Sequence, residues 1–356
     1  MTVRRIAVTN LALGSRGIPP TDHWNGALAE DSDIVSLMRW EVNGPIPGAF
    51  QERLKVDPDF ARAARALAVN MLAAGAADKA LDGIFKDAGR YLVAMWAVCL
   101  HVSGGLTLPR LKEICARSGF LSPGRARALL IYLRYLGYVE LFPSRHGGLT
   151  RYLPTGRFLG AWRRQLRAAL EAASIVEPAA RLVLDRLNEP EVFDAFVRLQ
   201  SRGLLDWARQ DDGDMAFVRV FMHPNAGTQI VWTLLAAGGD DIFPPRDPLR
   251  ISLAGTARRF GVSRVHVRRI LDDAEAAGIL RCVADGAVVL EDKGRSEIEY
   301  LYAGQLTQLL ASAAGTLRER PELTAPPSDD ARDRLPPARR ASEHTRLDMH
   351  GEWLER

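Results

Sequence analysis

Apolar residues recur at helical spacing along most of this chain, and short turns rich in glycine or proline interrupt them. From Asp57 to Phe85 the spacing predicts a pair of amphipathic helices that is broken near Gly75. Another amphipathic helix is predicted from Glu191 to Arg209, with aromatic residues and leucines spaced like those around Phe60. The pattern therefore predicts a mainly helical protein.

Three helices and a β-hairpin are predicted in that order between residues 90 and 153. The first helix, Arg90 to His101, is almost entirely apolar and ends before two glycines, so we expect it to be buried. The other elements are predicted as helices over Leu108–Arg117 and Pro123–Leu136 and as strands over Val139–Phe142 and Leu149–Leu153. Ser122 precedes a proline at the first helical position and is the predicted N-cap of the third helix.

The same order returns between residues 229 and 290, so the sequence contains an internal repeat. The letters that correspond are Ser122 with Ser263, Leu129-Leu130 with Ile270-Leu271, and Leu136-Gly137-Tyr138 with Ala277-Gly278-Ile279. An Asp285-Gly286 turn joins the two strands of the second hairpin. Helix, helix, helix and hairpin is the order of a winged helix. The predicted fold class is mainly α with small β-hairpin wings, as tandem winged helix-turn-helix domains with flanking amphipathic helices.

The stretch from Leu253 to Asp272 predicts a helix-turn-helix of the DNA-binding kind. Ala257 is small enough for two helices to cross closely, and Gly261 can take the positive φ that the turn requires. Ser252 and Ser263 are the predicted N-caps of the two helices. The residues expected to point inward are Phe260, Val262, Val267, Ile270 and Leu271. The alternative interpretation is an ordinary helical hairpin with a solvated basic face.

Hydrogen-bond donors follow the Ser263 cap, as recognition of a polyanion requires. The residues predicted to face DNA here are Arg264, His266, Arg268 and Arg269. A recognition helix presents such side chains to base edges and phosphates in the major groove. This stretch therefore makes nucleic-acid recognition the leading hypothesis.

A further helix is predicted after each hairpin, over Thr155–Ala172 and Ser296–Ala313. The second of these opens with a predicted capping box, in which Ser296 pairs with Glu299. The first is basic, and its arginines are Arg157, Arg163, Arg164 and Arg167. Such a charged face is usually only solvated, although its place beside the hairpin also suits contact with DNA. Met215 to Met222 is compatible with a strand or a buried helical segment.

Four parts of the chain are distinguished by these patterns. They are a flexible N-terminal arm over 1–31, a helical segment with the first winged helix over 32–172, a helical segment with the second over 173–315, and a disordered, proline-rich tail over 316–356. The length of 356 residues is compatible with two or three domains.

Composition changes this picture little. The net charge of +4 permits an anionic partner without demanding one, and the preference for arginine over lysine is treated as neutral. The three cysteines show neither a disulfide pattern nor metal-ligand spacing. The N-terminus lacks the apolar core of a signal peptide, and the longest apolar run, Tyr91 to Val102, is too short to cross a bilayer. We expect a bacterial, cytoplasmic and nucleoid-associated protein without membrane contact.

Leu253 to Leu290 resembles winged-helix transcriptional regulators, the MarR-like group in particular, and Leu106 to Leu153 resembles them less closely. The resemblance implies a recognition helix in the major groove, a wing near the minor groove and control of promoters. Besides the contacts in the second repeat, it places DNA contacts at Arg125, Arg127 and Arg134 and at the wing residues Arg145 and His146. Regulators of this group ordinarily carry one winged helix in each of two chains, whereas this chain carries two. The second wing carries Asp285, which would repel phosphate.

Two other functions compete with a sequence-specific regulator that binds double-stranded DNA. One is a replication initiator of the plasmid or phage kind, and the other is a structural winged-helix module that binds proteins. A homodimer and a protein partner such as RNA polymerase stay open. No phosphate loop, GxSxG or HExxH motif is present, so we predict no enzyme, no catalytic residue, no metal site and no cofactor. Trp96, Trp207 and Trp232 could line an effector pocket, but packing in the core is the preferred interpretation.

Overall fold

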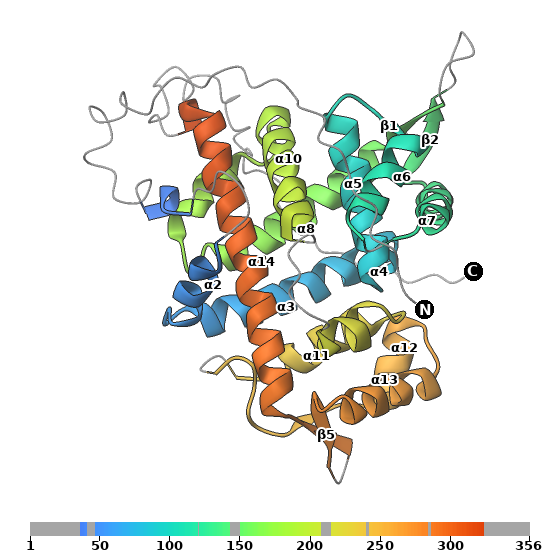
Figure 1. The fold of residues 1–356 in the computed structure, drawn as a ribbon, viewed down its shortest axis with the longest axis vertical. Coiled ribbons are helices and arrows are strands. Elements are labelled where there is room, and N and C mark those ends of the chain that lie inside the picture. The colour runs from blue at the N-terminus through green and yellow to red at the C-terminus, as the bar shows by residue number, and fades with distance from the viewer. Residues whose placement is uncertain are drawn as a thin grey trace, which may run out of the picture.

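The computed structural model describes residues 36–40, 47–119, 121–142, 150–207, 215–239, 242–283 and 286–323. These residues form a mainly helical protein with two small antiparallel sheets of three strands each (Figure 1). The predicted mainly α fold with small hairpins is confirmed at this level. No helix among the described residues is both long enough and apolar enough to cross a membrane.

The chain begins with helices α2 (Gly48–Lys55), α3 (Phe60–Ala77) and α4 (Lys79–Ile84). The predicted helical pair is confirmed, but its break falls at Asp78, not near Gly75. Asp78 ends α3 in an extended conformation, and its carboxylate accepts hydrogen bonds from the backbone N–H groups of Ala80 and Leu81. This side chain therefore caps α4 and fixes the corner between the two helices.

The first repeat contains seven elements. They are α5 (Ala88–Val102), β1 (Leu106–Thr107), α6 (Leu108–Arg117), α7 (Pro123–Tyr135), β2 (Val139–Phe142), β3 (Arg151–Pro154) and α8 (Gly156–Ala173). Strand β3 lies between β1 and β2, with Tyr152 opposite both Leu106 and Leu141. The bounds of α6 and β2 match the sequence prediction, because Thr107 caps α6 and the apolar run of β2 starts directly after the turn at Gly137.

The second repeat has the same seven elements in the same order. They are α11 (Gly227–Ala236), β4 (Leu249–Arg250), α12 (Leu253–Phe260), α13 (Arg264–Ala276), β5 (Leu280–Cys282), β6 (Ala287–Leu290) and α14 (Asp292–Glu319). Strand β6 again lies in the centre, between β4 and β5. The internal repeat seen in the letters is therefore also a repeat of elements and of sheet order.

Two helices and two short helical turns join the repeats. They are η1 (Pro178–Ala180), α9 (Arg181–Arg186), α10 (Pro190–Trp207) and the π-helical turn η2 (Val218–Met222). The open question over residues 215–222 is thus resolved in favour of a helical segment with Val220 and Phe221 buried.

Helix α14 differs from the prediction at both ends. It starts at Asp292 with Glu291 before it and without a side-chain cap, so Ser296 lies inside the helix and the predicted capping box is wrong. A Cβ at Gly294 would collide with the backbone O of Ile279, and glycine therefore lets α14 begin directly beside the sheet. At the other end α14 continues to Glu319, and Leu323 in the turn η4 (Pro321–Leu323) is buried. The ordered chain therefore continues beyond residue 316, where the tail was expected to begin.

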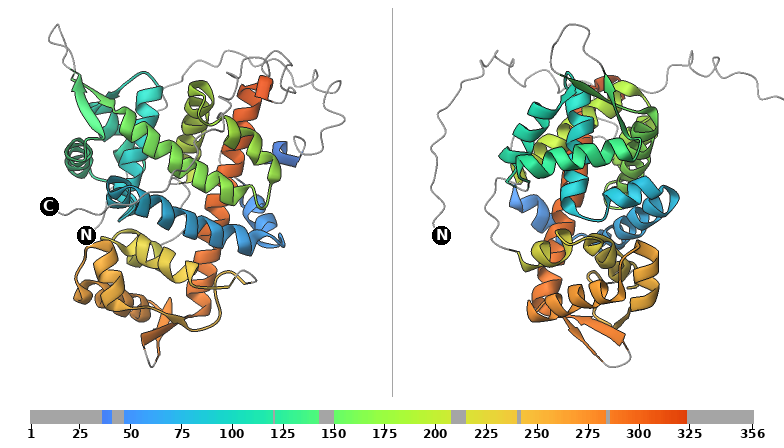
Figure 2. Two further views of the ribbon diagram at one scale, coloured as in Figure 1. Left: turned by 180° about the vertical axis from the view of Figure 1, so that it is seen from behind. Right: turned by 90° about the vertical axis from the view of Figure 1, so that its right-hand side faces the viewer.

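The repeats occupy different parts of one continuous apolar core. Figure 2 shows the second repeat at one end of the long axis, with α3 between it and the first repeat, while α14 spans both. Lys86 donates a hydrogen bond of 2.9 Å to the carbonyl of Phe260 at the end of α12, and Gln229 on α11 donates to Asp82. The second repeat is thus joined by polar contacts to α4 and to the segment just before α5, in addition to the shared core.

Candidate nucleic-acid interface

Helix α13 is held at its start by the features that the sequence predicts. Ser263 accepts a hydrogen bond from the backbone N–H of His266 at 3.0 Å, and Gly261 takes a φ of +63° in the turn. Ala257 on α12 and Val267 on α13 are both buried, and the two helices are in contact. The predicted caps, turn and inward face of this helix-turn-helix geometry are therefore confirmed as local structure.

Two arginines on α13 extend into solvent. Arg264 and Arg268 are both exposed, and neither forms a hydrogen bond or an ion pair with another described residue. Val265 between them is 77% exposed. These guanidinium groups can donate to phosphate or to guanine without first giving up an internal contact.

His266 lies differently from the prediction. Its ring is only partly exposed, and Nε2 donates a hydrogen bond of 2.7 Å to the backbone O of Asn225, just before α11. Arg269 donates from Nη2 to Nδ1 of the same ring at 3.2 Å. His266 therefore connects α13 to Asn225, just before α11, and Arg269 contacts the His266 ring.

On α7, the corresponding helix of the first repeat, Ser122 accepts a hydrogen bond from the N–H of Arg125 and caps the helix as predicted. The guanidinium of Arg125 donates to Asp87 at 3.2 Å. Asp87 is only 4% exposed, accepts from the N–H of Arg90 at the start of α5 and pairs with the Arg90 side chain at 3.0 Å. Arg125 is therefore engaged in holding α7 on α5.

The outer face of α7 is mixed. Arg127 and Arg134 are exposed, with no side-chain partner found in the described ranges. Beside them Ile131 is half exposed and Tyr135 is 85% exposed. On β2, Leu141 and Phe142 are also exposed. The sequence analysis missed this apolar group. Helical spacing could have indicated Ile131, because Leu130 and Leu133 face the core and Ile131 lies on another side of α7.

Three residues of the predicted wings lie outside the described residues. These are Arg145 and His146 in the first repeat and Asp285 in the second.

The basic helix α8 is described, and its arginines make contacts within the protein. Arg164 pairs with Asp78 at 3.2 Å, and Arg167 donates to the carbonyl of Leu184 at 2.8 Å. The charge of α8 therefore serves to join it to neighbouring helices.

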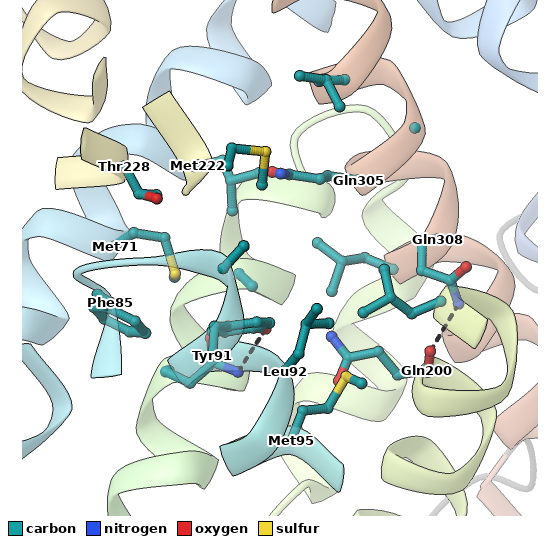
Figure 3. A pocket seen from close by; sticks show the side chains of 18 of the residues that line it. Met71, Phe85, Tyr91, Leu92, Met95, Gln200, Met222, Thr228, Gln305 and Gln308 are labelled. Carbon is teal, nitrogen blue, oxygen red and sulfur yellow. Dashed lines mark hydrogen bonds between the residues drawn. The ribbon is translucent and has the colours of Figure 1, made fainter. Parts of the chain in front are cut away.

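A cavity of about 200 Å³ lies between α2, α3, α5, α8, α10, η2, α11 and α14 (Figure 3). Trp232 lines it, whereas Trp96 is fully buried in the core and Trp207 is not among the lining residues. Burial raises the pKa of the lining residue Tyr91 to about 12, although the hydrogen bond with Gln165 opposes this shift. The sequence analysis named Trp232 for such a pocket but preferred packing in the core, and it did not point to the other lining residues. The signal in the sequence that could have indicated the cavity is glutamine on otherwise apolar helix faces, as at Gln165 and Gln200.

Other chemistry is limited in the described ranges. They contain no group of three or more His, Cys, Asp or Glu side chains that could hold a metal ion, and the three cysteines are free thiols. Comparisons with protein-family models, with curated proteins and with solved structures found no match. Functional inference therefore depends on the geometry of the chain itself.

Proposed function

We propose that this protein is a sequence-specific, double-stranded DNA-binding transcriptional regulator that uses two winged helix-turn-helix units resembling those of MarR-like regulators. The observation that carries the proposal is the repeated order of helices and strands, in which α7 and α13 occupy the position of a recognition helix. In each repeat a serine-capped helix is followed by an antiparallel hairpin. In DNA-binding winged helices this arrangement presents the start of the helix to a major groove, and this likeness supports the proposal.

The second repeat is the stronger candidate for reading bases. Arg264 and Arg268 lie near the start of α13, both are exposed, and each guanidinium can form paired hydrogen bonds with a guanine edge. Asp272, Asp273 and Glu275 follow on the same helix and are exposed. Since phosphate repels these carboxylates, we infer that DNA meets the N-terminal half of α13.

Genome-wide mapping of bound DNA, combined with selection of bound duplexes from a random pool, tests this function. We expect one recurring sequence motif that lies in promoters. Mapping to an origin with iterated sites would favour the replication initiator instead. The proposal is wrong if the selected pool contains no motif and the purified protein binds random duplexes no better than the exposed-arginine variants Arg264→Ala and Arg268→Ala do.

A second function, binding of a protein partner by the first repeat, is supported by its exposed apolar group. Ile131, Tyr135, Leu141 and Phe142 lie on α7 and β2, which would otherwise face DNA. An apolar surface of this kind suits a protein such as RNA polymerase better than a phosphate backbone. A pull-down of purified RNA polymerase by the protein and by its Tyr135→Ala variant tests this function, which requires capture by the parent chain and loss by the variant.

A further inference from the structure

The cavity described above is large enough for a small organic molecule. An engineered apolar cavity of about 150 Å³ holds benzene, and this one measures about 200 Å³. Its walls are mostly apolar, with Met71 and Phe85 on one side and Leu92 and Met95 below them in the close view (Figure 3). One aromatic ring with a second small ring would therefore be in contact with protein on most sides.

Two polar atoms in this cavity are buried without a partner. Gln200 is only 7% exposed, and its side-chain Oε1 accepts no hydrogen bond from any described residue. The same holds for Oγ1 of Thr228. Figure 3 places these residues on opposite sides of the cavity, with the Gln200 side chain directed towards Leu92. Because a buried polar group without a hydrogen bond is costly, each of these atoms needs a partner that the described chain does not supply.

The charged side chains that line the cavity determine whether it can hold a charged ligand. Asp87 is the single charged side chain among the described residues that line it, and Arg90 and Arg125 already pair with its carboxylate. The remaining polar groups are glutamines, Thr228 and Tyr91. A ligand with a net charge would be buried there without a counter-ion, which is strongly unfavourable.

We propose that this cavity binds an uncharged molecule of one or two rings that donates a hydrogen bond to Oε1 of Gln200. The apolar walls enclose the rings, and Thr228 supplies a second polar contact on the opposite side. None of these contacts involves DNA, so the cavity can be tested independently of the proposed regulatory function.

Isothermal titration calorimetry with indole and indene tests the proposal, because the two molecules have nearly the same shape and only indole carries an N–H. We expect indole to bind the parent chain about tenfold more tightly than indene, since a well-placed hydrogen bond in a closed site is worth about that factor. In Gln200→Met the preference should fall to about one while indene still binds. Benzoate, which is similar in size but anionic, should not bind.

Ala169→Leu provides a second test by filling the cavity from α8. Ala169 lines the cavity and is itself buried, so three additional carbons there should abolish binding of both indole and indene. Circular dichroism and a thermal melt check that this variant is folded. If it does not fold, the Gln200→Met comparison still decides the matter. Absence of indole binding to the parent chain, equal affinities for indole and indene, or an unchanged preference in Gln200→Met would each overturn the proposal.

Discussion

The two repeats share every element and the order of their strands, yet they present different chemistry on corresponding helices. Arg264 and Arg268 on α13 extend into solvent. On α7, Arg125 is bound to Asp87, and Ile131 and Tyr135 occupy much of the outer face. The inward positions of both helices are similar, whereas the outward positions have diverged. Common architecture therefore does not imply that both repeats contact the same partner.

The repeats also differ in how their helices are anchored. An ion pair with a buried carboxylate holds the start of α7, and a neutral hydrogen bond from His266 to the backbone of Asn225 holds α13. Arg264 and Arg268 on α13 are consequently left exposed, because a histidine performs the anchoring. In the first repeat the arginine itself performs it. The first three predictions below compare the two repeats, and the last compares two sides of α7.

The largest expected difference concerns glycines at the start of the last helix in each repeat. A Cβ at Gly294 would lie 2.1 Å from the backbone O of Ile279, whereas a Cβ at Gly156 has nothing within 4 Å. We expect Gly294→Ala to lower the free energy of unfolding by about 3 kcal/mol or more, because backbone must move. Gly156→Ala should be neutral or slightly stabilising. Urea unfolding of both variants measures this, and equal losses would contradict the close packing of α14 on the second sheet.

Recognition of bases should depend on the second repeat more than on the first. Arg264→Ala is expected to cost about 1–3 kcal/mol on the selected site and far less on random DNA. Arg127→Ala, at the exposed position of α7 that corresponds to Arg268, should cost less than about 1 kcal/mol on either duplex. Fluorescence anisotropy with both duplexes provides the measurement. The reverse order of losses would transfer base reading to α7.

The serine caps should be equivalent in the two repeats. Ser122 and Ser263 each accept one backbone N–H at the third position of the following helix, at 3.2 and 3.0 Å. Replacing either by alanine is expected to cost about 1 kcal/mol of stability. Thermal melts at one protein concentration can compare them. A large difference between the variants would mean that the two helix starts are not alike.

The smallest expected effect on stability is that of Tyr135→Ala. Because its side chain is 85% exposed, its removal should change the free energy of unfolding by less than about 0.5 kcal/mol. Ala126→Tyr on the buried side of the same helix should instead be strongly destabilising, since Ala126 is fully buried. Chemical denaturation separates the two cases, and a substantial loss in Tyr135→Ala would show that this ring packs within the chain.

Local elements could be predicted from the sequence because short-range chemistry determines them. The capped starts of α7, α12 and α13 and the turn at Gly261 depend on neighbours a few residues away. The start of α14 could not be predicted in this way. Ser296 and Glu299 have the letters of a capping box, but contact of Gly294 with Ile279 allows the helix to begin earlier. That contact joins segments which only the folded sheet brings together.

The candidate sites divide in the same manner. The exposure of Arg264 and Arg268 follows from helical periodicity, whereas the partner of His266 is the carbonyl of Asn225, which lies in another element. The sequence did not predict the role of Asp87, because its two arginine partners lie on different helices, α5 and α7. The cavity has walls from eight elements, so no local pattern could indicate its volume.

Asp87 belongs at once to the cavity wall and to the anchor of α7. If Arg125 moved to a phosphate, Asp87 would lose one of its two partners, and the electrostatic potential inside the cavity would change. Thermodynamic linkage then requires reciprocity: if DNA changes the affinity of the cavity for a molecule by some factor, that molecule changes the affinity for DNA by the same factor. Asp87 thus joins the cavity wall to α7, so a change at one of them alters the surroundings of the other.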